Sequence, residues 1–286
     1  MRATAVHNTT AEDVKSDGWH AELSLGFDYR INGTVLKRNS HRGPLRVQRP
    51  FYPEEGLPHV YLLHPPGGVV GSDRLDIRVE MRPNSRALLT SPGSTKFYRS
   101  AGETARLQQQ LVIAEGASLE WFPQENIIFN GARLNTTTRI DLAVDSCFIG
   151  WEINCLGRPC SDETFEQGAL YSRLELYRDQ QPLLVECQRV ANAAALHAAT
   201  GLRGYPMQAL FIATPCEAQH LNIARAVLTE GDAGFPIAAT LVDGVLIVRA
   251  LAQQSEALQR QMIPIWEALR PHLLNRPAIR PRIWST

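Results

Sequence analysis

The stretch HVYLLHPPGGVVGSDRLDIRVEM, from His59 to Met81, contains the pattern that decides the fold. Two short apolar runs, HVYLLH and LDIRVEM, stand on either side of a corner that is rich in glycine and proline. Short apolar runs bounded by turn residues are typical of β-strands. Glycines in the corner allow tight turns and positive φ angles. We therefore expect two strands joined by a tight corner.

The same pattern continues from Trp19 to about Val190. Runs such as HAELSLGFDYR, TTRIDLAV and CFIGWEI are separated by Gly, Pro, Asn and Asp. Many short strands at even spacing favour a sandwich, a barrel or layered sheets. The sequence has no fixed repeat period, so it does not support a propeller or a regular solenoid. The predicted fold class is mainly β, with layered antiparallel or mixed sheets in a β-helix-like or sandwich-like body.

From about residue 214 the pattern includes helices. Thr214 stands before Pro215 as a possible N-cap, which is typical of a helix start. Asp243-Gly244 separates two apolar runs and predicts a hairpin turn. The stretch from Ser255, SEALQRQMIPIWEALRPHLL, has apolar residues at helical spacing, with Ser255 as its cap. We expect about two α-helices in this C-terminal part.

Composition limits the classes of function. The 286 residues carry a formal net charge of zero, which gives no general case for binding nucleic acid or an anionic membrane. Residues 1–18 are polar and are expected to be disordered or frayed, followed by one β-rich domain over 19–286. No apolar run reaches the roughly 18 residues of a membrane span. With five cysteines and no visible signal peptide, we expect a cytoplasmic protein with reduced thiols.

Nucleotide-binding and nucleophile motifs are incomplete. GGVVG, at 67–71, lacks the GxGxxG spacing, and GSTK, at 93–96, lacks the rest of a phosphate-binding loop. The sequence contains no GxSxG nucleophile elbow. We therefore expect neither catalytic residues nor a tightly bound cofactor.

Metal-ligand spacings are also weak. Cys155 and Cys160 have a spacing that zinc sites use, but no second pair accompanies them. His59 and His64 are five residues apart on a predicted strand, so their side chains point to opposite faces. A built-in structural metal site is not expected from these residues.

Three carboxylates occur in unusual surroundings. Glu152 and Glu186 follow apolar residues within predicted strands, and Asp73 follows the glycine corner. A buried carboxylate is costly unless it is paired or solvated. One interpretation is that each faces water or pairs with a nearby arginine, for which the candidates are Arg158, Arg189 and Arg74. The other is a wet internal passage whose oxygen ligands hold divalent ions weakly.

Five long strings occur in order along the chain: HRGPLRVQRPFYPE, VYLLHPPGGVVGSDRL, ALLTSPGSTKFYRS, LEWFPQENIIFNGA and FIGWEINCLGRP. Together they resemble the UreD/UreH family of urease accessory proteins. The resemblance is strong from Trp19 to Val190 and looser beyond. Two departures are Ser72, where the family usually has glycine, and Cys160, where it usually has alanine.

The resemblance implies a β-rich scaffold that is not an enzyme. It implies partnership with UreF, with the GTPase UreG and with apo-urease, and transient passage of nickel through an internal channel. By the family pattern, the channel lining includes Asp73, Thr95, Glu152 and Glu186. A pure assembly module that bridges UreF to apo-urease without contacting nickel is the alternative, and an unrelated metal-dependent hydrolase is a more distant one.

Overall fold

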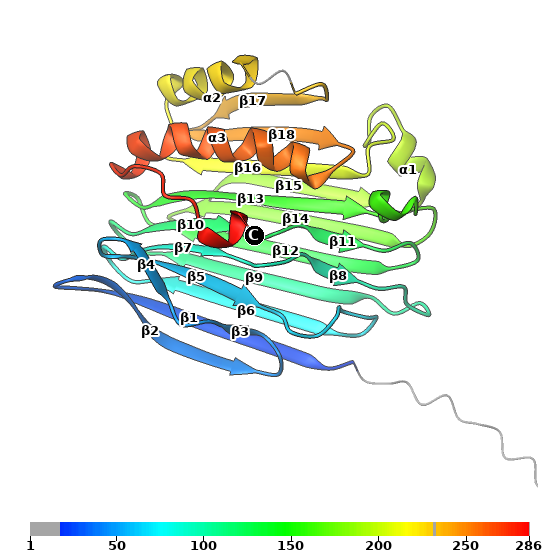
Figure 1. Ribbon diagram of the computed structural model, residues 1–286, viewed down its shortest axis with the longest axis horizontal. Coiled ribbons are helices and arrows are strands. Elements are labelled where there is room, and N and C mark those ends of the chain that lie inside the picture. The colour runs from blue at the N-terminus through cyan, green and yellow to red at the C-terminus, as the bar shows by residue number, and fades with distance from the viewer. Residues whose placement is uncertain (1–17, 231–232, 286) are drawn as a thin grey trace, which may run out of the picture.

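Two β-sheets face one another across an apolar interior, and helices flank one end of the pair (Figure 1). The structure, a computed structural model, describes residues 18–230 and 233–285. The predicted frayed segment therefore lies, apart from Gly18, outside the described residues.

The first sheet has seven strands in the order β15-β14-β12-β9-β6-β1-β2. Its central pairs, from β1 to β14, are parallel, and an antiparallel hairpin closes each edge. The strands are β1 His20–Arg30, β2 Gly33–Arg42, β6 Arg74–Met81, β9 Ala105–Ile113, β12 Arg133–Leu142, β14 Ala169–Arg178 and β15 Gln181–Val190.

The second sheet has eleven strands, and its main path is β17-β18-β16-β13-β10-β7-β5-β3. Strand β4 pairs with β5, while β8 pairs with β11 and β11 with β13. The strands are β3 Arg46–Val47, β4 Phe51–Glu54, β5 Leu57–Leu63, β7 Arg86–Thr90, β8 Thr95–Phe97, β10 Ser118–Phe122, β11 Asn126–Ile128, β13 Cys147–Leu156, β16 Met207–Thr214, β17 Ile237–Val242 and β18 Val245–Ala252.

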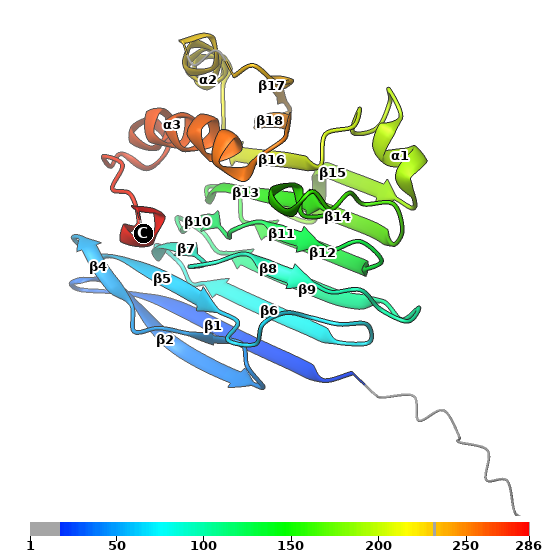
Figure 2. The same ribbon diagram turned by 45° about the vertical axis from the view of Figure 1, so that its right-hand side comes forward.

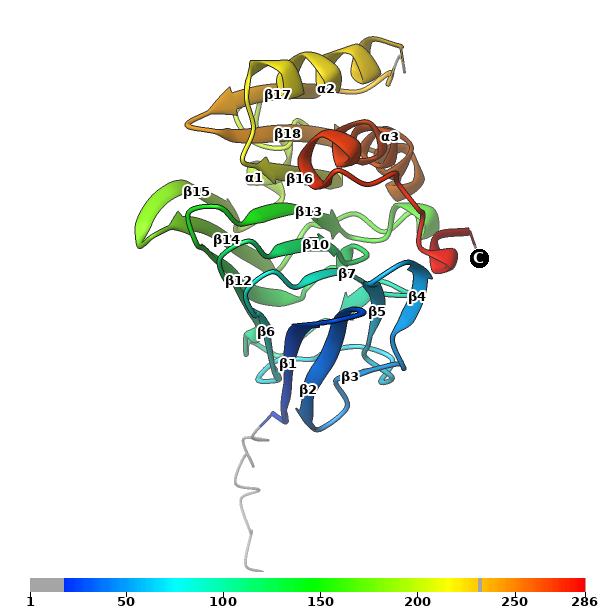
Figure 3. The same ribbon diagram turned by 90° about the vertical axis from the view of Figure 1, so that its left-hand side faces the viewer.

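From β5 to β14 the chain winds between the two sheets. The longer strands follow the order β5, β6, β7, β9, β10, β12, β13 and β14, and alternate between the second and the first sheet (Figure 2). Figure 3 shows the two layers from the end, with β14, β12 and β6 in one and β13, β10 and β7 in the other. This winding confirms the expected mainly β, β-helix-like body.

The interior is made by inward-facing positions of alternating strands. Val79, Leu111, Ile140 and Leu176 stand in register on neighbouring strands of the first sheet and are buried in one cluster with inward residues of the second. Because successive strand residues point to opposite faces, the short sequence alternation is enough to build this core. Coil lengths differ, which accounts for the missing sequence period.

Two helices lie beyond residue 214, as predicted: α2 is Ala218–Glu230 and α3 is Ser255–Leu274. A short helix, α1 Ala193–His197, precedes them and was not predicted. Two 3₁₀ turns are η1 Pro159–Ser161 and η2 Arg282–Ser285. Helices α2 and α3 pack on the outer face of the second sheet and form a second core.

Two predicted helix caps are wrong. Thr214 is the last residue of β16, and its hydroxyl donates to the carbonyl of Gly244 in the β17–β18 turn. Helix α2 begins only at Ala218, after a short connection. Ser255 is the first residue of α3, after Gln254, which makes no side-chain cap. The predicted Asp243-Gly244 turn is confirmed, with φ angles of 47° and 77°.

Candidate functional site

Two adjoining pockets lie between the sheets and bring together three of the four predicted channel residues. The first, a cavity of about 320 Å³, is lined by Thr95 and Glu152. The second, of about 600 Å³, is lined by Glu152 and Glu186. Because Glu152, Leu174 and Leu210 line both, a continuous lining leads from Thr95 to Glu186. We call this lining the inter-sheet passage.

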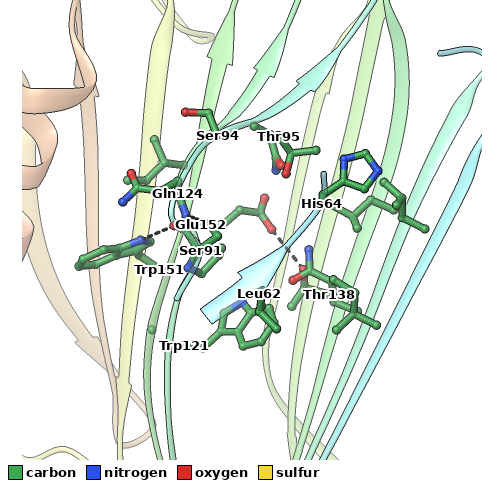
Figure 4. Close-up of a pocket in the computed structure, with 18 of the residues that line it drawn as sticks. Leu62, His64, Ser91, Ser94, Thr95, Trp121, Gln124, Thr138, Trp151 and Glu152 are labelled. Atoms are coloured by element: carbon green, nitrogen blue, oxygen red, sulfur yellow. Dashed lines mark hydrogen bonds between the residues drawn. The ribbon is translucent and has the colours of Figure 1, made fainter. Parts of the chain in front are cut away.

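Glu152 stands at the junction of the two pockets. It occupies an inward position of β13, and its carboxylate accepts hydrogen bonds from the hydroxyl of Ser172 at 2.6 Å, from Thr138 at 3.3 Å and from the amide of Asn154 at 3.1 Å. Figure 4 shows Glu152 projecting into the cavity towards Thr138, with Thr95 and His64 around the same space. No arginine pairs with Glu152 among the described residues, so the predicted partner Arg158 is wrong; Arg158 binds Glu163 instead.

A band of polar side chains on the first sheet faces Glu152. Gln109, Thr136, Thr138 and Ser172 hold inward positions on β9, β12 and β14, where neighbouring inward rows are apolar. Gln109 is in register with Thr138, and Thr136 with Ser172. This band is not among the residues predicted from the sequence. Its signal is a polar residue at an inward position of an alternating run, as in RLQQQLVI and NTTTRI.

Glu186 lies at the far end of the passage, where it forms an ion pair with Arg249 of β18. The pair joins the edge strand β15 of the first sheet to the second sheet. Pairing with an arginine is therefore confirmed for Glu186. The predicted partner, Arg189, is wrong, because Glu186 pairs with Arg249, which is 63 residues further along the chain.

Asp73 does not line either pocket. Its two carboxylate oxygens accept the backbone N–H groups of Trp19, at 3.1 Å, and of Val70, at 3.0 Å, so that it holds the corner together. The predicted pairing with Arg74 is wrong, because Arg74 binds Asp76. Asp73 interacts electrostatically with His64, which lines the first cavity: burial lowers the pKa of His64, and the Asp73 carboxylate opposes this effect.

The glycines of the corner serve close packing rather than positive φ. A Cβ on Gly68 would lie 2.3 Å from the ring of Tyr98, and one on Gly71 would lie 2.7 Å from Cβ of Ser100. The residue with positive φ is Ser72, at 71°. The expectation of positive φ at the corner glycines is therefore wrong, and the left-handed position of the corner is held by Ser72.

The other metal-ligand candidates from the sequence do not form a site. Cys155 is buried, which raises its pKa to about 12, whereas Cys160 is exposed on η1. His59 is buried on the outer side of the second sheet and contacts Glu54 at 3.1 Å, while His64 faces the passage. The two histidines thus lie on opposite sides, as predicted.

One further group within residues 18–230 and 233–285 has metal-ligand geometry: His20, Glu22 and Asp76, on the outer face of the first sheet. Both ring nitrogens of His20 contact a carboxylate, and Arg74 donates to Asp76. The group is therefore a surface ion-pair network. Asp73, Glu152 and Glu186 do not form such a group; the two glutamates are spaced along the passage.

A buried charged cluster, also missed from sequence, fixes α3 to the second sheet. The guanidinium of Arg270 is fully buried and pairs with Glu120 at 2.9 Å and with Glu54 at 2.5 Å. The indole of Trp266 also donates to Glu120, at 2.6 Å. The cluster lies on the face of the sheet opposite to the passage, so its role is to hold the helix.

No helix in the described part of the chain is long and apolar enough to cross a membrane.

Comparison with known proteins adds independent information. A family profile described as UreD urease accessory protein matches residues 20–285. The urease accessory protein UreD of Alcanivorax borkumensis is 49% identical over 273 residues, which cover 94% of this chain and 93% of the relative. That of Citrobacter koseri is 42% identical over 279 residues, covering 98% and 96%. That of Pseudomonas putida strain GB-1 is 44% identical over 269 residues, covering 94% and 95%.

These relatives bear the name of an accessory protein and not of a catalytic enzyme. The matches extend over nearly the full length and include the five strings that carry the resemblance. The chain therefore belongs to the UreD family of urease accessory proteins.

Proposed function

We propose that this chain is a non-catalytic scaffold and metallochaperone in the cytoplasm. With UreF and the GTPase UreG, it supports GTP-dependent nickel insertion into apo-urease, and nickel crosses it through the inter-sheet passage. Nickel is the cargo and is not a resident cofactor.

The sharing of Glu152 between the two pockets carries this proposal. At the junction of the two pockets Glu152 offers carboxylate oxygens to a passing ion, while Ser172, Thr138 and Asn154 hold the carboxylate in place. Such hydrogen bonds orient a ligand and tune its affinity.

The ligand chemistry also supports transit rather than storage. The carboxylates of Glu152 and Glu186 are separated along the passage, so neither belongs to a closed four-ligand cage of the kind that holds structural metal. Isolated oxygen ligands bind a divalent ion weakly enough to release it.

The alternative, a pure assembly module that bridges UreF to apo-urease, predicts that the passage is dispensable. The test is urease activity in cells that express the urease operon with wild-type chain or with Glu186→Ala, alongside pull-down of the accessory complex. Glu175→Ala is the matched control: Glu175 is also paired with an arginine, Arg173, but on the outer face of the same sheet.

We expect Glu186→Ala to lower urease activation by roughly tenfold, as loss of a metal-site group does, with the complex intact and Glu175→Ala near wild type. Normal activation with Glu186→Ala would support the assembly module and remove nickel from the role of this chain.

A further inference from the structure

Two buried polar atoms in the first cavity have no hydrogen-bond partner among the described residues. They are Nε2 of His64 and Oε1 of Gln109, and both residues line the cavity. Gln109 is 92% buried, since 8% of its surface is exposed. Buried polar groups are normally satisfied, so both atoms point to an occupant of the cavity that offers them an interaction.

The two atoms come from opposite sheets. His64 directly follows β5 of the second sheet, and its ring is stacked on Trp19, with centroids 5.8 Å apart and planes 10° apart. Stacking fixes the ring through its face and leaves Nε2 free. Gln109 lies on β9 of the first sheet, in register with Thr138, whose hydroxyl binds Glu152.

The donor set is mixed. Glu152 and Gln109 supply oxygen, which every divalent cation accepts, and His64 supplies an imidazole nitrogen. Imidazole suits Ni²⁺, Zn²⁺ and Cu²⁺, whereas Mg²⁺ and Ca²⁺ prefer oxygen alone. One nitrogen among oxygen donors therefore favours a borderline transition-metal ion over the far more abundant hard cations, without a closed cage.

We propose that His64 is a nitrogen ligand for the ion in transit and, with Gln109 opposite, makes the inter-sheet passage selective for first-row transition-metal cations over Mg²⁺ and Ca²⁺. This inference rests on the proposed function, because it assigns the selectivity of the same passage.

The test uses the full chain without an affinity tag, in complex with its partners where it needs them, and NiCl₂ alone as the probe. Nickel K-edge X-ray absorption reports imidazole ligands through their multiple scattering, and titration with and without excess MgCl₂ reports selectivity. The variants are His64→Gln and, as a matched control, His197→Gln, which changes an exposed histidine of α1.

Wild type and His197→Gln are expected to show an imidazole ligand and to bind nickel in excess magnesium. His64→Gln is expected to lose that ligand and to bind nickel roughly tenfold more weakly, with magnesium now competing. Gln109→Leu removes the oxygen donor of the first sheet and replaces it with an apolar side chain of similar size. This variant is also expected to bind nickel more weakly. It supplies the test if His64→Gln does not fold.

An unchanged imidazole signal and unchanged competition in His64→Gln, or unweakened nickel binding in Gln109→Leu when that variant is needed, would overturn the inference. If Glu186→Ala nevertheless lowers urease activation as expected, the proposed passage stands and only its selectivity is wrongly assigned. If Glu186→Ala is also normal, the passage fails together with the inference.

Discussion

At the scale of single residues, Ser72 has an unusual backbone conformation for a residue with a side chain. Its φ of 71° lies in the left-handed region, where a side chain with Cβ is strained and glycine is not. The neighbouring Gly71 has no such angle but has no room for a Cβ. The two positions therefore respond to substitution in opposite directions.

We predict that Ser72→Gly stabilises the chain by about 1 kcal/mol, because relief of the left-handed strain outweighs the added freedom of glycine in the unfolded state. Gly71→Ala is the paired variant and should destabilise, since its Cβ would meet Ser100 at 2.7 Å. Urea unfolding of the two variants and the parent measures both effects. A loss of stability in Ser72→Gly would contradict the backbone argument.

The carboxylates differ in how much of their role the sequence reveals. Glu152 and Glu186, which follow apolar residues in the sequence, line the pockets between the sheets, and Glu186 is also paired with Arg249. Asp73 lines neither pocket and holds the corner by accepting two backbone N–H groups. A sequence pattern shows that a carboxylate needs partners, but it does not show whether those partners are water, side chains or backbone.

At the scale of elements, α3 is attached to the second sheet by a buried cluster of charged side chains and by Trp266, which binds to it. Arg270, Glu54 and Glu120 pair inside the protein, and Trp266 lies over them with its indole on Glu120. Removing one member of a buried ion pair leaves an uncompensated charge, which costs about 3–5 kcal/mol. The helix and sheet therefore depend on each other.

This cluster predicts a pH dependence. Burial raises the pKa of Glu54, but hydrogen bonds from His59 and Arg270 outweigh it, so the pKa is below its ordinary value of 4.5. As the pH falls, Glu54 is protonated in the unfolded chain near pH 4.5 but in the folded chain only at a lower pH. The stabilisation that ionised Glu54 provides above pH 4.5 is therefore lost as the pH falls through the pKa of the folded state.

The free energy of unfolding should therefore fall between about pH 5 and the lower folded pKa, with a contribution from Glu54 of up to about 1.4 kcal/mol per pH unit. Glu54→Gln should flatten this slope, whatever its effect at neutral pH. Glu267→Gln, which removes the partner of Arg280 on the same helix, is the control for losing an ion pair of α3 outside the cluster, and Glu54→Gln should flatten the slope more than it does. Denaturant titrations across this range compare the slopes, and equal slopes in all three proteins would count against the cluster.

At the scale of the whole molecule, the winding between two sheets creates the passage. Each turn of the chain adds one strand to each sheet, so inward residues from distant parts of the sequence share one interior. Inward apolar residues such as Leu107 and Ile140 line the first cavity together with Gln109 and Thr138, and Ser172 lines the pocket beyond. The proposed route for nickel thus lies in the same interior that forms the apolar core.

Leu174 gives a test that changes no charge, because it lines both pockets at their junction. We predict that Leu174→Trp, which fills the junction, lowers urease activation to the level seen without the chain while the accessory complex still forms. Leu174→Met keeps nearly the same volume and should be tolerated. Activation assays with pull-down compare the two, and full activation with Leu174→Trp would argue for a bridging role alone.

The sequence by itself determined the mainly β class, the Asp243-Gly244 hairpin, the span of α3 and the family, because each rests on local periodicity, turn chemistry or long ordered strings. Only the tertiary structure decided the partners of the polar groups. Glu186 pairs with a residue 63 positions away, and Arg270 with residues 150 and 216 positions away. The physical reason is that local patterns specify which face of a strand is buried, while the winding of the chain decides what that face meets.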